Sequence, residues 1–480
     1  MSTQSGSLPF PPRSQTVASS EPLVERVSSK RFLSGKKGTA DTVMQLNAVL
    51  TRELAGGLER NANLATSVFP DTSFSFRIDT PLVANLAPPK RPMRRASTRT
   101  RTAHALGPQK RRNTIHLPSS IPGAAESLIL NPPKDWSESN LAGWLNDIGT
   151  ALENTYVNIN LLIGAYTAAD GKRILPPKKI WCPRHSTNAL EGSPIKRKPD
   201  VILLDTSSIS NPTWPRVHAL CEITRSELKK NRTIKDTILQ KSLITITSQS
   251  NRNFFPCLSF SRDSFTFTIC DRSGVVESKT LKVKKHSLVL LRIIAGLMFA
   301  RPSDIGYDES IDCDENGKAI NIRLKGETLR VIEDLFMSDS MRGRATRCWR
   351  VARGEDINQE EYVLKDSWAD VRRMHSEILT LTLIEERGLC KDRVVPRLVL
   401  GEDVCVHTGT DSKPIYIKDT TARHRDPTVK HVDERVHRRL LMGPVGKHIS
   451  TFTSLKELIG AFVDLVEGWL HPSIIAYKFY

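Results

Sequence analysis

Residues 343–377 contain a glycine, a lysine and a glutamate in an order that could bind phosphate groups. Gly343 lies in a tight turn between two β-type segments, and Lys365 ends the apolar segment Tyr362–Lys365. A helical pattern that carries Glu377 comes next. Backbone N–H groups of a glycine turn can surround phosphate oxygens, and a lysine held by a carboxylate adds a fixed positive charge beside them. These residue types therefore predict a phosphate-binding site.

The glycine turn and the lysine also have simpler explanations. Of the three glycines in a G-x-G-x-x-G loop only Gly343 is present, while Ala345 and Cys348 occupy the other two positions. A single glycine is common in hairpins. Lys365 lies 22 residues after Gly343, which leaves room for two strands of about 5–6 residues and a loop. Without further support, a solvent-facing lysine on an edge strand is the simpler interpretation of Lys365.

The carboxylate that would hold the lysine is one of three candidates. Glu377 follows Lys365 by only 12 residues, so the connection from strand to helix would be short. Glu385 or Glu386, later in the same helical pattern, could take its place.

Several short motifs along the chain, from about residue 130 to 470, resemble the fungal-type protein kinase family in their sequence and in their order. They are Trp214-Pro215-Arg216-Val217, Cys221-Glu222-Ile223, Cys270-Asp271-Arg272-Ser273-Gly274, Gly343-Arg344-Ala345-Thr346 with Cys348-Trp349, Val363-Leu364-Lys365-Asp366-Ser367-Trp368, Arg438-Arg439-Leu440, Pro444-Val445-Gly446-Lys447 and Ser454-Leu455-Lys456-Glu457-Leu458.

The resemblance implies a kinase small lobe, ATP as cofactor, and phosphoryl transfer to serine or threonine of proteins as the family activity. In such a lobe the loop with Gly343 and Ala345 would cover the phosphates. Lys365 would pair with them, and Glu377 would hold the lysine in place.

The residues that perform phosphoryl transfer are missing from this sequence. A kinase needs H-R-D-L-x-x-x-N, D-F-G and their Mg²⁺ ligands. His424-Arg425-Asp426 is followed by His431 where the asparagine should be, so we interpret it as a chance tripeptide. It also precedes the helical pattern Ser454–Leu470, which in a kinase should come before the catalytic loop. We therefore expect a truncated and catalytically inactive kinase-like chain, with weak or absent ATP binding and without Mg²⁺ ligands.

A second pair of acidic residues suggests a different chemistry. Asp200 precedes the buried-strand pattern Val201–Leu204, and Glu222 lies on the next strand. This matches the outline of PD-(D/E)xK nucleases, in which two carboxylates hold a divalent metal. The lysine expected two residues after the glutamate is Thr224 here, which argues against hydrolysis. A metal-dependent nuclease-like domain remains an alternative.

Charge and composition allow a third interpretation, a non-catalytic protein that binds nucleic acid or an acidic partner. The net charge is +18, and a basic cluster runs from Lys90 to Arg112. Its alternative is a charged linker. Eight cysteines without regular spacing favour an intracellular location, in cytoplasm or nucleus. No apolar segment approaches the ~18 residues of a membrane-spanning helix, so we expect no membrane partner.

Taken together, these patterns predict an α+β protein in three parts. Residues 1–124 form a mostly disordered basic region with one helix near 42–58. Residues 125–310 form an α+β domain, for which a PD-(D/E)xK-like fold is one option. Residues 311–480 form the kinase-like small lobe and the first helix of the large lobe.

Overall fold

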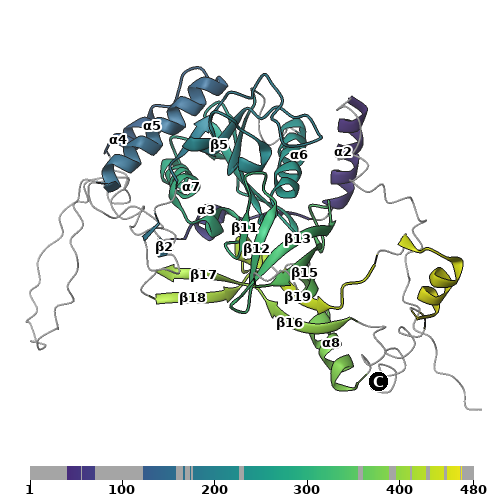
Figure 1. Cartoon of the computed structure of the whole chain (residues 1–480). Coiled ribbons are helices and arrows are strands. Elements are labelled where there is room, and N and C mark those ends of the chain that lie inside the picture. The colour runs from purple at the N-terminus through teal and green to yellow at the C-terminus, as the bar shows by residue number, and fades with distance from the viewer. Residues whose placement is uncertain are drawn as a thin grey trace, which may run out of the picture.

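The computed structural model of the chain contains helices and two large sheets (Figure 1). The fold is mixed α and β, which confirms the predicted class. The basic segment Lys90–Arg112 and residues 1–39 lie outside the described residues. The described residues are 40–55, 57–70, 123–157, 166–167, 173–174, 177–225, 232–354, 360–388, 396–410, 413–428, 433–447, 451–464 and 466.

The first sheet has eight strands in the order β1-β9-β8-β7-β6-β5-β4, with β10 paired to β8. Strands β4, β5 and β6 form an antiparallel meander, and β6 then runs parallel to β7. A parallel pair needs a crossover, which helix α6 (Arg232–Ser248) provides. The strands are β1 (Leu58–Arg60), β4 (Lys179–Cys182), β5 (Val201–Asp205), β6 (Ala219–Ile223), β7 (Phe255–Ser261), β8 (Ser264–Asp271), β9 (Gly274–Glu277) and β10 (Leu281–Lys282).

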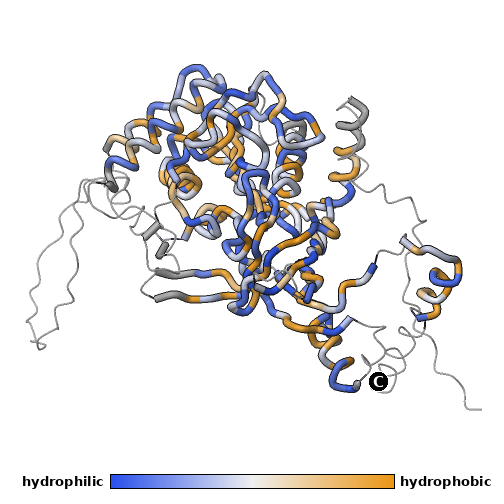
Figure 2. Tube along the Cα trace, in the orientation of Figure 1, coloured by the Kyte–Doolittle hydropathy of each residue, from blue (hydrophilic) through white to orange (hydrophobic). Residues whose placement is uncertain are grey.

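Helices cover both faces of this sheet, and every residue of β7, β8 and β9 is buried. On β5, Val201 and Leu203 enter one core and Ile202 and Leu204 enter the other. Figure 2 shows hydrophobic residues concentrated between the helices and the sheet. The first core lies under α3 (Leu64–Val68), α4 (Gly123–Leu130), α5 (Glu138–Val157) and α7 (Ser287–Phe299), and the second lies under α2 (Ala40–Glu53) and α6.

Residues 58–68 belong to this layered unit although no sequence pattern predicted it. Strand β1 pairs in parallel with β9, and α3 buries Leu64 and Val68 in the first core. Elements of three and five residues are too short to show a hydrophobic period. Within the segment expected to hold a helix near 42–58, α2 ends at Glu53.

The second sheet has seven strands, all antiparallel to their neighbours, in the order β11-β12-β13-β14-β15-β19-β16. Its hydrophobic core includes Trp349, Leu364 and Leu441. The strands are β11 (Ile311–Cys313), β12 (Ala319–Leu324), β13 (Glu327–Met337), β14 (Arg347–Arg353), β15 (Glu361–Asp370), β16 (Arg397–Asp403) and β19 (Arg435–Gly443).

Helix α8 (Glu377–Glu386) connects β15 to β16 and packs on β16. The hydroxyl of Ser376 accepts a hydrogen bond from the N–H of Leu379 at 3.1 Å, so a side-chain cap fixes the start of the helix. The short remaining elements are β2 (Tyr166–Thr167) with β3 (Arg173–Ile174), β17 (Cys405–Thr410) with β18 (Lys413–Lys418), and the 3-10 turns η2 (Thr206–Ser208), η3 (Trp214–Arg216), η4 (Pro302–Ile305) and η5 (Thr421–His424).

Residues 455–464 form a helix near the C-terminal end of the described chain. Its apolar side chains are largely exposed, with 69% of Leu455, 55% of Ile459 and 50% of Phe462 accessible. The predicted helix Ser454–Leu470 therefore exists over most of its described length, and other described residues leave its apolar face largely uncovered.

Candidate phosphate-binding site

Lys365 lies at the centre of the second sheet. Strand β15 is paired on both sides, and Lys365 is opposite Cys348 on β14 and Leu440 on β19. The edge-strand alternative is therefore wrong for this lysine. Because residues directly opposite one another share a face of a sheet, Lys365, Cys348 and Leu440 share one face.

Glu377 is the carboxylate that meets Lys365. The ammonium of Lys365 lies 2.6 Å and 2.7 Å from the two carboxylate oxygens of Glu377. The short connection is possible because β15 continues to Asp370 and α8 starts at Glu377 itself, so the glutamate occupies the first turn of the helix. A negative charge in the first turn also interacts favourably with the helix dipole.

The pair is open to solvent on one side. The side chains of Lys365 and Glu377 are 19% and 41% exposed. An ion pair of this kind contributes only about 0–1 kcal/mol to stability. What it provides is a lysine ammonium that is held in a fixed position and is partly accessible to solvent.

The opposite face of β15 carries a buried network of charges. Asp366, the residue after Lys365, accepts hydrogen bonds from His437 at 2.7 Å and from the Nε of Arg439 at 2.9 Å. Arg439 also pairs with Asp308, and His437 lies 3.4 Å from Asp419. Each of these side chains is at most 8% exposed, so the charges neutralise one another away from water.

Protonation in this network follows from its charges. Burial lowers the pKa of His437, but the carboxylates of Asp366 and Asp419 outweigh burial and raise it to about 9. Burial raises the pKa of Asp366, but the positive charges of His437 and Arg439 outweigh burial and hold this pKa well below its usual range. His437 is therefore an imidazolium near neutral pH. Its ring also stacks on Trp368, with centroids 4.8 Å apart and planes at 3°.

The structure places Gly343 and Ala345 in the segment 338–346 that connects β13 to β14. Gly343 has a φ of +130°, a conformation that favours glycine. Ala345 is buried, with a φ of +44°. The carbonyl of Arg344 accepts a hydrogen bond from the N–H of Trp368 at 2.7 Å, so the segment runs beside the end of β15. The segment also contacts Glu53 at the end of α2, Arg272 between β8 and β9, and Asp433 before β19.

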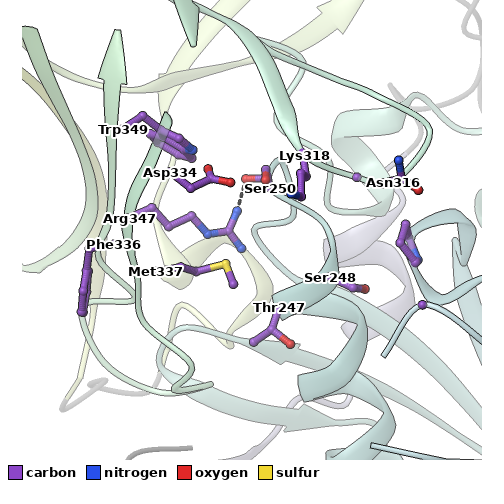
Figure 3. A pocket seen from close by; sticks show the side chains of 13 residues that line it. Thr247, Ser248, Ser250, Asn316, Lys318, Asp334, Phe336, Met337, Arg347 and Trp349 are labelled. Carbon is purple, nitrogen blue, oxygen red and sulfur yellow. Dashed lines mark hydrogen bonds between the residues drawn. The ribbon is translucent and has the colours of Figure 1, made fainter. Parts of the chain in front are cut away.

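A cavity of about 220 Å³ lies on the other face of β14 from Cys348, and Figure 3 shows side chains that line it. Arg347 and Trp349 line it, and Arg347 donates hydrogen bonds to the carbonyls of Ser250 and, at 2.8 Å, of Ile246. Lys365 is not among its lining residues. The cavity therefore lies between the second sheet and the end of α6, separate from the lysine–glutamate pair.

The tripeptide His424-Arg425-Asp426 has a structural role. Arg425 makes two hydrogen bonds to the buried carboxylate of Asp271, at 2.6 Å and 2.9 Å, and a third to Glu59 at 3.0 Å. Asp426 accepts hydrogen bonds from the backbone and hydroxyl of Thr428. These contacts join the residue after η5 to the first sheet.

Asp200 and Glu222 lie together on the first sheet. The N–H of Ile223 donates to Asp200 at 2.8 Å, and the N–H of Asp200 donates to Glu222 at 3.3 Å. Lys241 of α6, which no sequence pattern singled out, lies 2.5 Å from Glu222. Glu222 and Lys241 are 3% and 2% exposed. Burial raises the pKa of Glu222 to about 7, although Lys241 lowers it.

Metal clusters and membrane-spanning helices are both absent from the described part of the chain. There, no three histidine, cysteine, aspartate or glutamate side chains come together as a candidate metal site. Among the same residues, no helix has both the length and the apolar character needed to span a membrane.

The residues that sequence reasoning missed are all buried polar groups. Lys241 lies in α6, two residues from Leu239 and from Leu243, and a lysine that is buried in a helix signals a charged partner. Asp366 and His437 had no such signal. They are 71 residues apart, and only the pairing of β15 with β19 brings them together.

Comparison with known proteins supplies the family. The profile of the family described as fungal protein kinase matches residues 198–473, more than half of the chain. No curated protein and no solved structure gives a significant match. The matched region includes Asp200 and Glu222 of the first sheet as well as Lys365 and Glu377 of the second. The resemblance found in the sequence is thus confirmed, and the chain belongs to the fungal protein kinase family.

Proposed function

We propose that the second sheet and α8 form the nucleotide-binding lobe of a kinase-like protein. Lys365 would contact the phosphates of ATP, and Glu377 would hold the lysine. The observation that carries this proposal is the contact of 2.6 Å between Lys365 and Glu377 on a central strand and the following helix. In protein kinases the lysine and the glutamate of these two elements must be paired for phosphate binding to be productive.

The order of the elements supports the same proposal. Along the chain, β13 leads through the segment 338–346 to β14, then to β15 with Lys365, and then to α8 with Glu377. A kinase small lobe arranges its glycine loop, strand lysine and helix glutamate in this sequence. The antiparallel sheet lets β14 and β15 lie side by side, so the loop and the lysine end up at the same region of the sheet.

We propose that the residues of this sequence bind nucleotide but do not by themselves transfer its phosphoryl group. Transfer requires an aspartate at the substrate hydroxyl and two further groups for Mg²⁺. The sequence has neither the complete catalytic-loop motif nor D-F-G. Without them the electrostatic stabilisation of the transition state is missing. When bound, Mg²⁺ would neutralise phosphate charge, and for that the described site offers only the carboxylate of Glu377, already paired with Lys365.

The test is ATP binding by the full chain, measured by isothermal titration with and without Mg²⁺. Lys365→Ala should abolish saturable binding. The matched control is Lys282→Ala, which removes an exposed lysine paired with Asp263 on the first sheet and should leave binding unchanged. Equal binding by wild type and Lys365→Ala would refute the proposal, provided that both proteins are folded by circular dichroism.

A second candidate function, metal-dependent hydrolysis of nucleic acid, is favoured by one observation. Asp200 precedes β5, Glu222 lies on β6 and Lys241 lies on the crossover helix α6. The fold brings the three side chains together although Lys241 is 41 residues after Asp200. It ranks second because Glu222 and Lys241 are enclosed and occupied by each other. Mg²⁺-dependent cleavage that disappears in Asp200→Ala would establish it, and absence of cleavage in the wild type would dismiss it.

A further inference from the structure

The segment 338–346 is bound to the first sheet and its helices at several points. Its Met341 is fully buried in the core under α2 and α6, together with Leu50 and Leu54 of α2 and the turn that follows it. The carbonyl of Ser340 accepts a hydrogen bond from Arg272, which lies in the turn between β8 and β9, at 3.3 Å. A hydrophobic anchor and polar contacts thus hold the segment from outside its own sheet.

Backbone N–H groups of this segment are already used. The N–H of Arg342 donates to the carboxylate of Glu53 at 2.6 Å, and that of Gly343 donates to the carbonyl of Arg272 at 2.9 Å. The N–H of Ser340 lies 3.4 Å from the hydroxyl of Ser338. These are the groups that a glycine loop offers to phosphates. An N–H that donates to a protein acceptor is not available to a nucleotide.

The side chain of Arg342 adds a second set of contacts. Its guanidinium lies 2.8 Å from Asp433 and donates to the carbonyl of Ala55 at 2.6 Å. Arg342 therefore connects the segment to the end of α2 and to the residues before β19. Burial raises the pKa of Glu53 to about 7, although hydrogen bonds from the backbone of Arg342 and Met341 lower it, which shows how closely the segment covers this carboxylate.

We infer that residues 338–346 act as a latch: in the closed state this loop is held on the first sheet, and nucleotide affinity is reduced. In the open state the loop leaves the first sheet and can contact phosphates. The inference rests on the proposed function, because it concerns the same nucleotide site. Only molecules with an open latch can offer the N–H groups of Arg342 and Gly343 to phosphates, so the apparent affinity is reduced by the open fraction. Contacts made by α2 and by the turn at Arg272 would thereby regulate the site around Lys365.

The experiment compares wild type, Arg342→Ala and Lys282→Ala. Arg342→Ala removes the contacts to Asp433 and Ala55. Lys282→Ala also removes a cation paired with an aspartate, but on the first sheet and outside the segment, so it is the matched control. Hydrogen–deuterium exchange without nucleotide reports on the N–H groups of residues 342 and 343, and titration with ATP reports affinity. We expect faster exchange and about tenfold tighter binding in Arg342→Ala, and neither change in Lys282→Ala.

The outcomes separate the latch from the proposed function. If Arg342→Ala speeds exchange but binds ATP no more tightly than wild type, the latch is refuted while nucleotide binding stands. If neither wild type nor Arg342→Ala binds ATP, the proposed function fails and the latch has no site to regulate. If the segment exchanges rapidly in wild type, it is not anchored and the inference is wrong. Thermal unfolding of each variant verifies that the comparison concerns folded protein.

Discussion

The two faces of strand β15 differ in how far their charged side chains are exposed to water. Lys365 points to a face where its partner Glu377 is 41% exposed. Asp366, its neighbour in sequence, points to a face where its partners His437 and Arg439 are fully buried. Water screens the first pair and leaves it open to a ligand, whereas the second set has no alternative to its protein partners. We therefore expect Lys365 to contribute to ligand binding and Asp366, the next residue, to contribute to stability.

This contrast predicts the largest effect for Asp366→Ala. The substitution leaves the charges of His437 and Arg439 without this carboxylate in a buried environment, which should reduce the free energy of unfolding by about 3–5 kcal/mol. Urea unfolding followed by circular dichroism measures it. A loss below about 1 kcal/mol would mean that the buried face is no more important to stability than the exposed one.

The next effect is a pH dependence that comes from His437. Its pKa is about 9 in the folded protein and about 6.5 in the unfolded chain, so its stabilising contribution is complete below pH 6.5. The contribution is lost as pH rises through 9 and amounts to roughly 3 kcal/mol. Unfolding free energies at pH 6 and pH 10 should therefore differ more in wild type than in His437→Gln. Equal slopes in the two proteins would contradict the assigned protonation.

A smaller effect is expected where α8 meets β16. A Cβ at Gly401 would come within 2.9 Å of the side chain of Ile378, the residue after Glu377. Gly401→Ala should therefore displace α8, at a cost of about 1–3 kcal/mol. It should also weaken ATP binding by moving Glu377 away from Lys365. Gly446→Ala, where no atom lies within 4 Å, is the control and should change neither quantity.

The smallest effect on stability is expected for Lys365→Ala. Removal of a partly exposed ion pair should change the free energy of unfolding by about 0–1 kcal/mol, while ATP binding disappears. A large loss of ATP binding with a small change in the free energy of unfolding would separate the role of Lys365 from that of Asp366. A destabilisation as large as that of Asp366→Ala would assign Lys365 to the scaffold instead of to the site.

Much of the site could be predicted because its signals are local. The apolar segment that ends at Lys365 and the helical pattern with Glu377 are contiguous in sequence, and the structure forms a strand and a helix there. Distant pairing could not be predicted. The choice of Glu377 over Glu385 depends on where β15 ends and where Ser376 caps α8, and propensities determine such boundaries poorly. The position of the loop with Gly343 could not be predicted either, because it is set by contacts with Glu53 and Arg272, which are far away in sequence.

The sequence by itself determined the family, the α+β class and the identity of the strand lysine, because short-range periodicity and ordered motifs encode them. Only the tertiary structure decided that Lys365 lies on an interior strand and that Asp366 joins a buried network with His437. It also decided that Met341 anchors its loop in the core between the first sheet and helices α2 and α6. The physical reason is the same in each case. Burial and pairing depend on which distant segments share a face, and a one-residue shift in register would reverse the faces of Lys365 and Asp366.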